Sequence, residues 1–172
     1  GIANALCAAV SLLILRKIGR TERRIAMLGT LIIGMLVFTG AATITNFGFD
    51  RNNTRTLSAQ QAGLTKAQIS KMDLAWSLGF PDATTMRSQG AVVGKNVFLP
   101  VPDLSAMYAL DVSDPAKPCI QWIYKSPGDA PLRSSPSYGV TADGTPLLVF
   151  SGLDATVHAV DARTGKAVWT KA

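Results

Sequence analysis

The sequence predicts transmembrane helices near the N-terminus, followed by an all-β region that is built from a repeated unit. Two long apolar runs fill most of the first 46 residues, whereas the rest alternates short apolar runs with glycine, proline and aspartate. The three tryptophans, Trp76, Trp122 and Trp169, lie 46 and 47 residues apart. Such regular spacing indicates a tandem repeat.

The longer apolar run covers residues 25–46 and contains no charged residue. As a helix it would extend roughly 33 Å, which is enough to cross a bilayer core. Residues 2–15 form a second apolar run that is short for a membrane span, so we expect a truncated first helix. We therefore assign residues 1–46 to a membrane anchor, a helical hairpin in contact with the lipid bilayer.

A basic loop separates the two apolar runs and predicts their orientation. It contains one anion, Glu22, and five cations: Arg16, Lys17, Arg20, Arg23 and Arg24. Such loops normally stay on the cytoplasmic side. We expect a protein of the bacterial inner (cytoplasmic) membrane whose C-terminal domain lies in the periplasm. A signal sequence with its apolar region starting at Ile25 is the alternative.

The charge distribution argues against nucleic-acid binding. The formal net charge is +6, but residues 47–172 carry twelve cations against ten anions, scattered singly. Scattered charges are typical of a solvated surface, and the interleaving of basic and aromatic residues that binds single strands is missing. We expect no nucleic-acid partner.

Residues 47–63 are expected to form a linker between the anchor and the repeats. This stretch is polar and lacks hydrophobic periodicity. Thr65 and Gln68 then have capping-box spacing, which predicts a short helix that ends near Met72.

Residues 64–172 contain the repeat, and each repeat has the pattern of four short strands. In the first repeat the apolar runs occupy residues 91–93, 96–101, 107–112 and 120–124. A four-stranded unit of about 45 residues in tandem is typical of the blade of a β-propeller. We therefore predict a partial β-propeller of about two four-stranded blades, plus an extra strand around Trp76.

The second repeat contains a tight-turn pattern before its last strand. Asp161 can cap such a turn, and Gly165 can adopt a positive φ. Asp111 occupies the matching place in the first repeat, where a longer loop with two prolines follows. We expect the tryptophan after each turn to bury its ring between adjacent blades, which is a structural role.

The residues around these turns resemble the repeat of propeller proteins that bind pyrroloquinoline quinone (PQQ). The likeness lies in YALDV and CIQWIY of the first repeat and in VHAVDARTGKAVWTK of the second. It covers residues 62–172 and is nearest to the polyvinyl-alcohol-dehydrogenase-like quinoproteins. The resemblance implies a ring of about seven or eight blades around a central channel that holds the quinone and calcium.

Two blades supply only part of such a ring, so we expect either a longer protein or a partner that covers the open blade faces. We expect no cofactor for this chain alone, and PQQ with Ca²⁺ if the propeller is complete. Arg87 and Arg133 begin the innermost strands and are candidates for binding an anionic ligand such as the quinone. The alternative is that each arginine bonds to the neighbouring blade.

The other reactive residue types have structural interpretations. His158, the single histidine, aligns with Tyr108 and is expected to pack between blades. Cys7 and Cys119 lie in different regions and are each expected to be small buried side chains. No catalytic set, haem-attachment motif or zinc spacing appears, so we predict no catalytic and no metal-binding residue.

Three functions remain open. The first is a membrane-anchored structural or docking subunit of a larger complex, respiratory or photosynthetic, whose partners are other membrane protein subunits. The second is the N-terminal part of a PQQ-dependent alcohol or sugar dehydrogenase, and the third is a non-catalytic propeller scaffold. The sequence favours the first and does not establish an enzyme activity.

Overall fold

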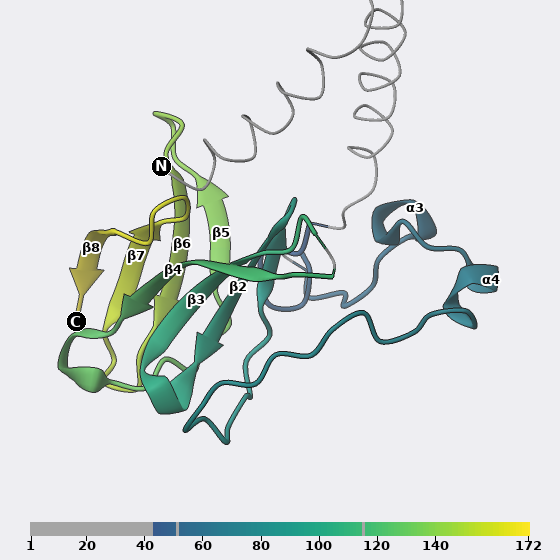
Figure 1. Cartoon of the computed structure of the whole chain (residues 1–172). Helices are drawn as coiled ribbons and strands as arrows, with labels where there is room; N and C mark the ends of the chain where they lie inside the picture. Colours follow the sequence, from purple (N-terminus) through teal and green to yellow (C-terminus); the bar gives the residue numbers. More distant parts are fainter. Residues whose placement is uncertain (1–42, 51, 115) are drawn as a thin grey trace, which may run out of the picture. The chain divides into compact units, whose positions relative to one another are not determined.

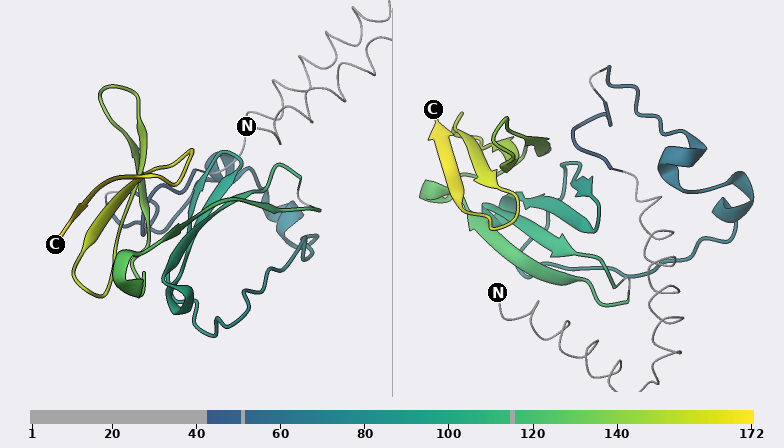
Figure 2. Two further views of the ribbon diagram at one scale, coloured as in Figure 1. Left: turned by 60° about the vertical axis from the view of Figure 1, so that its left-hand side comes forward. Right: turned by 90° about the horizontal axis from the view of Figure 1, so that it is seen from above.

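The computed structural model describes residues 43–50, 52–114 and 116–172. Within these residues, eight strands form two four-stranded sheets, and the strand order in each sheet follows the chain. Every neighbouring pair of strands is antiparallel. The two sheets lie side by side (Figures 1 and 2) and share one hydrophobic core.

The first sheet consists of β1 (Ala91–Val93), β2 (Asn96–Val101), β3 (Ala106–Asp111) and β4 (Cys119–Lys125). The second consists of β5 (Ser137–Val140), β6 (Pro146–Ser151), β7 (Val157–Asp161) and β8 (Ala167–Lys171). Short 3-10 turns occupy Pro102–Leu104 and Pro127–Asp129. The strands of the first sheet lie within one residue of the four apolar runs in the sequence.

The two sheets repeat the same irregularity. The pairing of β3 with β4 shifts its register between Ala109 and Leu110, and that of β7 with β8 shifts between Ala159 and Val160. A bulge of this kind bends a strand and increases its twist. Because the bulges occupy matching positions 50 residues apart, the sheets are two copies of one structural unit.

The expected fold class, transmembrane helices followed by a partial propeller with an extra strand, is corrected by the structure. Among the described residues no helix is long and apolar enough to cross a membrane, and the fold is all-β. The two apolar runs up to residue 42 and the basic loop lie outside the described residues. Ile44, expected at the end of a span, is instead extended and pairs with Val92 of β1.

Two one-turn helices precede the first sheet. Ser58 and Gln61 form a capping box at α3 (Ala59–Ala62), and Thr65 and Gln68 form one at α4 (Lys66–Ile69). The capping box predicted at Thr65 is therefore present. The second helix ends before Met72, because the Ser70 N–H already bonds to the Gln68 carbonyl and closes the last turn.

The extra strand expected around Trp76 does not form, since residues 74–80 pair with no strand in the described part of the chain. The segment is held by other contacts. The Phe80 ring packs on Tyr108 with a centroid distance of 4.7 Å. Further along, the Asp103 carboxylate accepts hydrogen bonds from the backbone N–H of Thr84 at 2.7 Å and of Thr85 at 2.9 Å. The segment thus covers part of the outer face of the first sheet.

Candidate functional site at the seam between the sheets

The indole of Trp122 on β4 docks on the turn between β7 and β8. Trp122 is 9% exposed, and its Nε1–H donates a hydrogen bond of 3.1 Å to the Ala162 carbonyl. Gly165 in the same turn has a φ of +70°, and a Cβ at this position would lie 2.6 Å from the Trp122 ring. The turn therefore requires glycine at residue 165, because a side chain would displace the ring.

Asp161 holds this turn in shape. Its carboxylate accepts hydrogen bonds from the backbone N–H of Arg163 at 2.8 Å and of Thr164 at 3.2 Å. The hydrogen bond from the Arg163 guanidinium and these backbone bonds hold the pKa of Asp161 below its usual value. In the first sheet the Asp111 carboxylate accepts the Ser113 N–H at 2.7 Å in the same way. The two aspartates therefore shape equivalent turns.

A second contact between the sheets joins Tyr124 of β4 to His158 of β7. The Tyr124 hydroxyl lies 3.0 Å from His158 Nδ1, and the imidazole stacks on Phe150 with a centroid distance of 5.6 Å. His158 is 1% exposed, and its Nε2 has no partner among the described residues. Burial lowers the pKa of His158, with opposition from the charge of Asp154, and burial raises the pKa of Tyr124.

The buried imidazole predicts a dependence of stability on pH. The folded chain binds the His158 proton less readily than the unfolded chain, whose histidine has a pKa of about 6.5. The free energy of unfolding should therefore fall as the pH drops below about 6.5 and recover above it. We expect urea denaturation between about pH 5 and 8 to show this slope, and His158→Phe to remove it. An unchanged slope in the variant would contradict the assignment.

The segments that precede β1 and β5 contact each other where the sequence placed the candidate arginines. Ser88 Oγ donates a hydrogen bond of 2.5 Å to the Arg133 carbonyl, and Ser135 Oγ accepts one of 3.0 Å from the Gln89 N–H. The side chains of Arg87 and Arg133 are exposed, and neither guanidinium makes a hydrogen bond within the described residues. The structure brings the two segments together but assigns neither guanidinium a ligand.

The remaining residues singled out in the sequence lie in different environments. Trp169 on β8 is 43% exposed, and Trp76 lies in the segment without strands. His158 lies at the seam, as described above. The prediction of a buried Cys119 is wrong, because the thiol is free and exposed at the start of β4, where the side chain points away from the core.

One face of the second sheet is open, whereas the corresponding face of the first sheet is covered by the second sheet. Ala109 pairs with Trp122 in the first sheet, and Ala159 pairs with Trp169 at the matching position in the second. Trp122 is buried against the second sheet, whereas Trp169 is exposed. By strand register this open face includes Ser137, Gly139, Leu147, Val149, Ser151, Val157, Ala159, Trp169 and Lys171.

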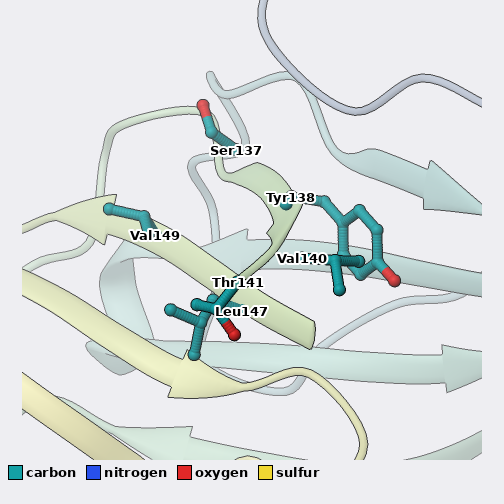
Figure 3. Close-up of a pocket in the computed structure, with 7 residues that line it drawn as sticks. Ser137, Tyr138, Val140, Thr141, Leu147 and Val149 are labelled. Atoms are coloured by element: carbon teal, nitrogen blue, oxygen red, sulfur yellow. The ribbon is translucent and has the colours of Figure 1, made fainter. Parts of the chain in front are cut away.

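A hollow of about 270 Å³ lies on the open face where β5 pairs with β6 (Figure 3). Its lining residues are Ser137, Tyr138, Gly139, Val140, Thr141, Leu147 and Val149. At the matching register of the first sheet, Val93 stands in place of Gly139 and Phe98 in place of Val149. The smaller side chains at these two positions leave room for a group from outside, although Leu147 is larger than its counterpart Asn96.

The described residues do not include a cluster of acidic side chains that fits a calcium ion. No group of three or more histidine, cysteine, aspartate or glutamate side chains among them is arranged to hold a metal ion. Calcium takes six to eight oxygen ligands, and a carboxylate cluster usually provides several of them. Such a site would need oxygen donors from outside the two sheets, so we derive no chemistry through PQQ with Ca²⁺.

Sequence reasoning predicted that His158 packs between blades, but it missed its partner Tyr124 and the serine bridges ahead of β1 and β5. The bridges had a signal, because Ser88 and Ser134 follow arginines 46 residues apart. Matching positions in adjacent units of a repeat lie near each other. The contact of Tyr124 had no signal, since its counterpart in the second repeat is Lys171.

Two four-stranded antiparallel sheets that pack face to face, each with its strands in chain order, define adjacent blades of a β-propeller. Comparisons with solved structures support a propeller fold of the quinoprotein type. The chain is similar to a europium-containing methanol dehydrogenase with a TM-score of 0.57 and 21% sequence identity, over 76% of this chain and 23% of that enzyme. Its similarity to the quinohemoprotein alcohol dehydrogenase from Comamonas testosteroni has a TM-score of 0.57 and 20% identity, over 76% and 19% of the two chains.

The chain therefore spans about a fifth of the length of these enzymes. Identities near 20% show the shared fold and leave activity open. No family model matches the sequence, and no curated protein matches it either.

Proposed function

We propose that this chain supplies two neighbouring blades to a larger propeller of the quinoprotein type and that it acts as a docking module. Its open face on the β5–β8 sheet receives the next blade. The observation that carries this proposal is the contrast between Trp122 and Trp169, which occupy matching positions on the two sheets but are 9% and 43% exposed.

The contact of Trp122 with the second sheet indicates what kind of contact Trp169 would make with a docking partner. On the covered face, Trp122 needs a carbonyl acceptor and a glycine turn, and the second sheet provides both. The docking partner of Trp169 would need the same two features. A buried tryptophan ring covers about 150–250 Å² of apolar surface, so leaving one half exposed forgoes a large hydrophobic contribution.

Other apolar side chains on the second sheet support the same proposal. Leu147 and Val149 of the open face are only partly buried, and both line the hollow on this face. Apolar groups left uncovered together on one face are a mark of interaction sites. The docking partner is thus expected to be apolar at its centre.

Photo-crosslinking tests the docking proposal in the cells that make the protein. A benzophenone amino acid in place of Lys171 lies at the position that Tyr124 takes on the covered face. We expect illumination to attach it to a segment of another four-stranded repeat, near a turn with the pattern Asp-x-x-x-Gly. The control position is Lys117, which is exposed in the loop between β3 and β4.

The crosslinked peptide decides the result. A blade of the same or another polypeptide, joined at residue 171 and not at residue 117, supports docking. Equal yields at the two positions, or attachment to lipid or to a protein without such a repeat, would contradict the proposal.

A second candidate function is that of a PQQ-dependent alcohol dehydrogenase, of which this chain would be a part. The fold shared with a methanol dehydrogenase and an alcohol dehydrogenase favours it. The quinone and Ca²⁺ would then bind to a completed ring. Alcohol oxidation by the isolated crosslinked assembly, dependent on added PQQ and Ca²⁺, would support this candidate over a purely structural role.

The predicted inner-membrane and periplasmic location, the membrane-subunit and lipid partners and the absence of a nucleic-acid partner stay predictions from the sequence. No contact within the described residues bears on them. The docking proposal does not depend on them, because it rests on the faces of the two sheets.

A further inference from the structure

Residues 43–45 form a short segment that pairs with the first sheet through Ile44, and a turn follows at residues 46–49. The Ile44 N–H donates a hydrogen bond of 2.8 Å to the Val92 carbonyl, and the Val92 N–H donates one of 2.8 Å to the Ile44 carbonyl. The pair is an antiparallel bridge on the free edge of β1. The segment thus adds a short pairing beyond the four strands of the sheet.

The same segment also bonds to the second sheet and to the chain between the sheets. The Tyr138 N–H of β5 donates a hydrogen bond of 2.6 Å to the Thr45 carbonyl. The Gln89 amide donates to the Asn46 carbonyl at 3.1 Å and accepts from the Gly48 N–H at 3.5 Å. Both sheets therefore hold the segment.

The position of the segment follows from the topology. β1 and β5 are the first strands of their sheets, each with one free edge, and they contact each other across the seam. In a propeller the strands that converge in this way line the central channel, while the last strands spread apart at the rim. Ile44 and Thr45 bond to these channel-side strands.

A turn after Asn46 leads the chain away from β1 and β5. The Phe49 N–H bonds to the Asn46 carbonyl at 3.2 Å, and the Arg55 N–H bonds to the Gly48 carbonyl at 3.0 Å. The Arg55 guanidinium lies 5.1 Å from the centre of the Phe47 ring, a cation–π contact. The beginning of the expected linker is therefore folded against the sheets.

We infer that residues 43–45 are a short channel-side segment, which clips the two blades together and occupies part of the central channel of the ring that they would form. The channel position rests on the proposed function, whereas the clip does not. The backbone groups of Val92 and Tyr138 that a channel ligand would otherwise meet are already bonded to this segment. A ligand on the axis would have to contact residues 44–46 or displace them.

Hydrogen exchange of the full chain tests the clip. Ile44→Pro removes the N–H that binds Val92 and fixes φ near −65°, so the pair should open. We expect the amides of Val92 and Tyr138 to exchange at least about tenfold faster in this variant, while the amide of Leu110, in the middle of the first sheet, keeps its rate.

Thr45→Pro is the matched control, because its own N–H makes no hydrogen bond within the described residues and proline keeps the preceding residue extended. It should leave both amides protected. Gln89→Ala removes the two side-chain bonds without touching the backbone pair, and it should speed exchange at Gly48 about tenfold.

Two results would overturn the clip: unprotected Val92 and Tyr138 amides in the unaltered chain, or equal protection in the two proline variants. If Ile44→Pro unfolds the whole domain, the amides of Val92 and Tyr138 in the unaltered chain still decide, because unprotected exchange there excludes the clip. Failure of the clip leaves the crosslink at residue 171 unaffected. Loss of that crosslink, with the amides of Val92 and Tyr138 still protected, would contradict the proposed larger ring. The clip between the two sheets would then still be supported.

Discussion

Trp122→Ala is expected to lower the free energy of unfolding of the described domain by about 3–5 kcal/mol, the usual range for removing a buried large aromatic. The ring fills the seam between the sheets, and its Nε1–H satisfies the Ala162 carbonyl. Its loss leaves a cavity and an unpaired carbonyl. Urea denaturation of the full chain, followed by circular dichroism, measures the change.

Trp169→Ala is the matched control for this prediction. The same residue type at the same place in the repeat is 43% exposed, and no second sheet among the described residues packs against it. We expect a loss of less than about 1 kcal/mol, typical of a surface substitution. Comparable losses in the two variants would show that the covered and open faces are wrongly assigned. A large loss of unfolding free energy for Trp169→Ala that occurs only in the native assembly would agree with docking.

Most of the fold that could be predicted from the sequence was predicted from the spacing of the tryptophans. Trp122 and Trp169 are the fourth-strand residues of two sheets, and the apolar runs before them became strands because glycine and aspartate turns separate them. Short-range signals of this kind act within one sheet, where neighbouring strands follow each other in the chain. They also indicated the capping box at Thr65, whereas the one at Ser58 lay in the expected linker and was not predicted.

Trp76 shows where repeat spacing misleads. Its surroundings resemble the fourth strand of a sheet, but a strand needs a partner edge, and no third strand precedes it in the described chain. Ile44 shows the opposite error, because it was predicted to lie in a helix but pairs with a strand. An uncharged apolar stretch predicts a membrane helix from composition alone. The free edge of β1, whose hydrogen-bonding groups are left open by the sheet, pairs with this residue instead.

The contacts at the seam could not be predicted because they join residues far apart in sequence. His158 was expected to pack between blades, but its hydroxyl partner on Tyr124 depends on how the sheets align face to face. Arg87 and Arg133 were predicted from their repeated position, and the structure shows that serine hydroxyls bond to the backbone of the facing segment while the arginine side chains stay exposed. Alignment of faces is set by packing, which sequence periodicity does not encode.

Gly165→Ala is expected to destabilise the domain by about 2–5 kcal/mol. A non-glycine residue at a φ of +70° costs roughly 1–2 kcal/mol. The added Cβ would also meet the Trp122 ring at 2.6 Å, and overpacking of this kind costs about 1–3 kcal/mol more. The measurement is again the free energy of unfolding of the full chain in urea.

Gly144→Ala separates the two contributions, because Gly144 has a φ of +84° and no atom within 4 Å of the added Cβ. It should cost only the conformational part, about 1–2 kcal/mol. In a Trp122→Ala background the clash at residue 165 is gone, so the additional loss from Gly165→Ala should shrink to that of Gly144→Ala. The difference between the backgrounds is the coupling energy of ring and turn. Strict additivity of Trp122→Ala and Gly165→Ala would mean that the indole does not contact this turn. The contact of Trp122 could then no longer serve as the model for docking at Trp169.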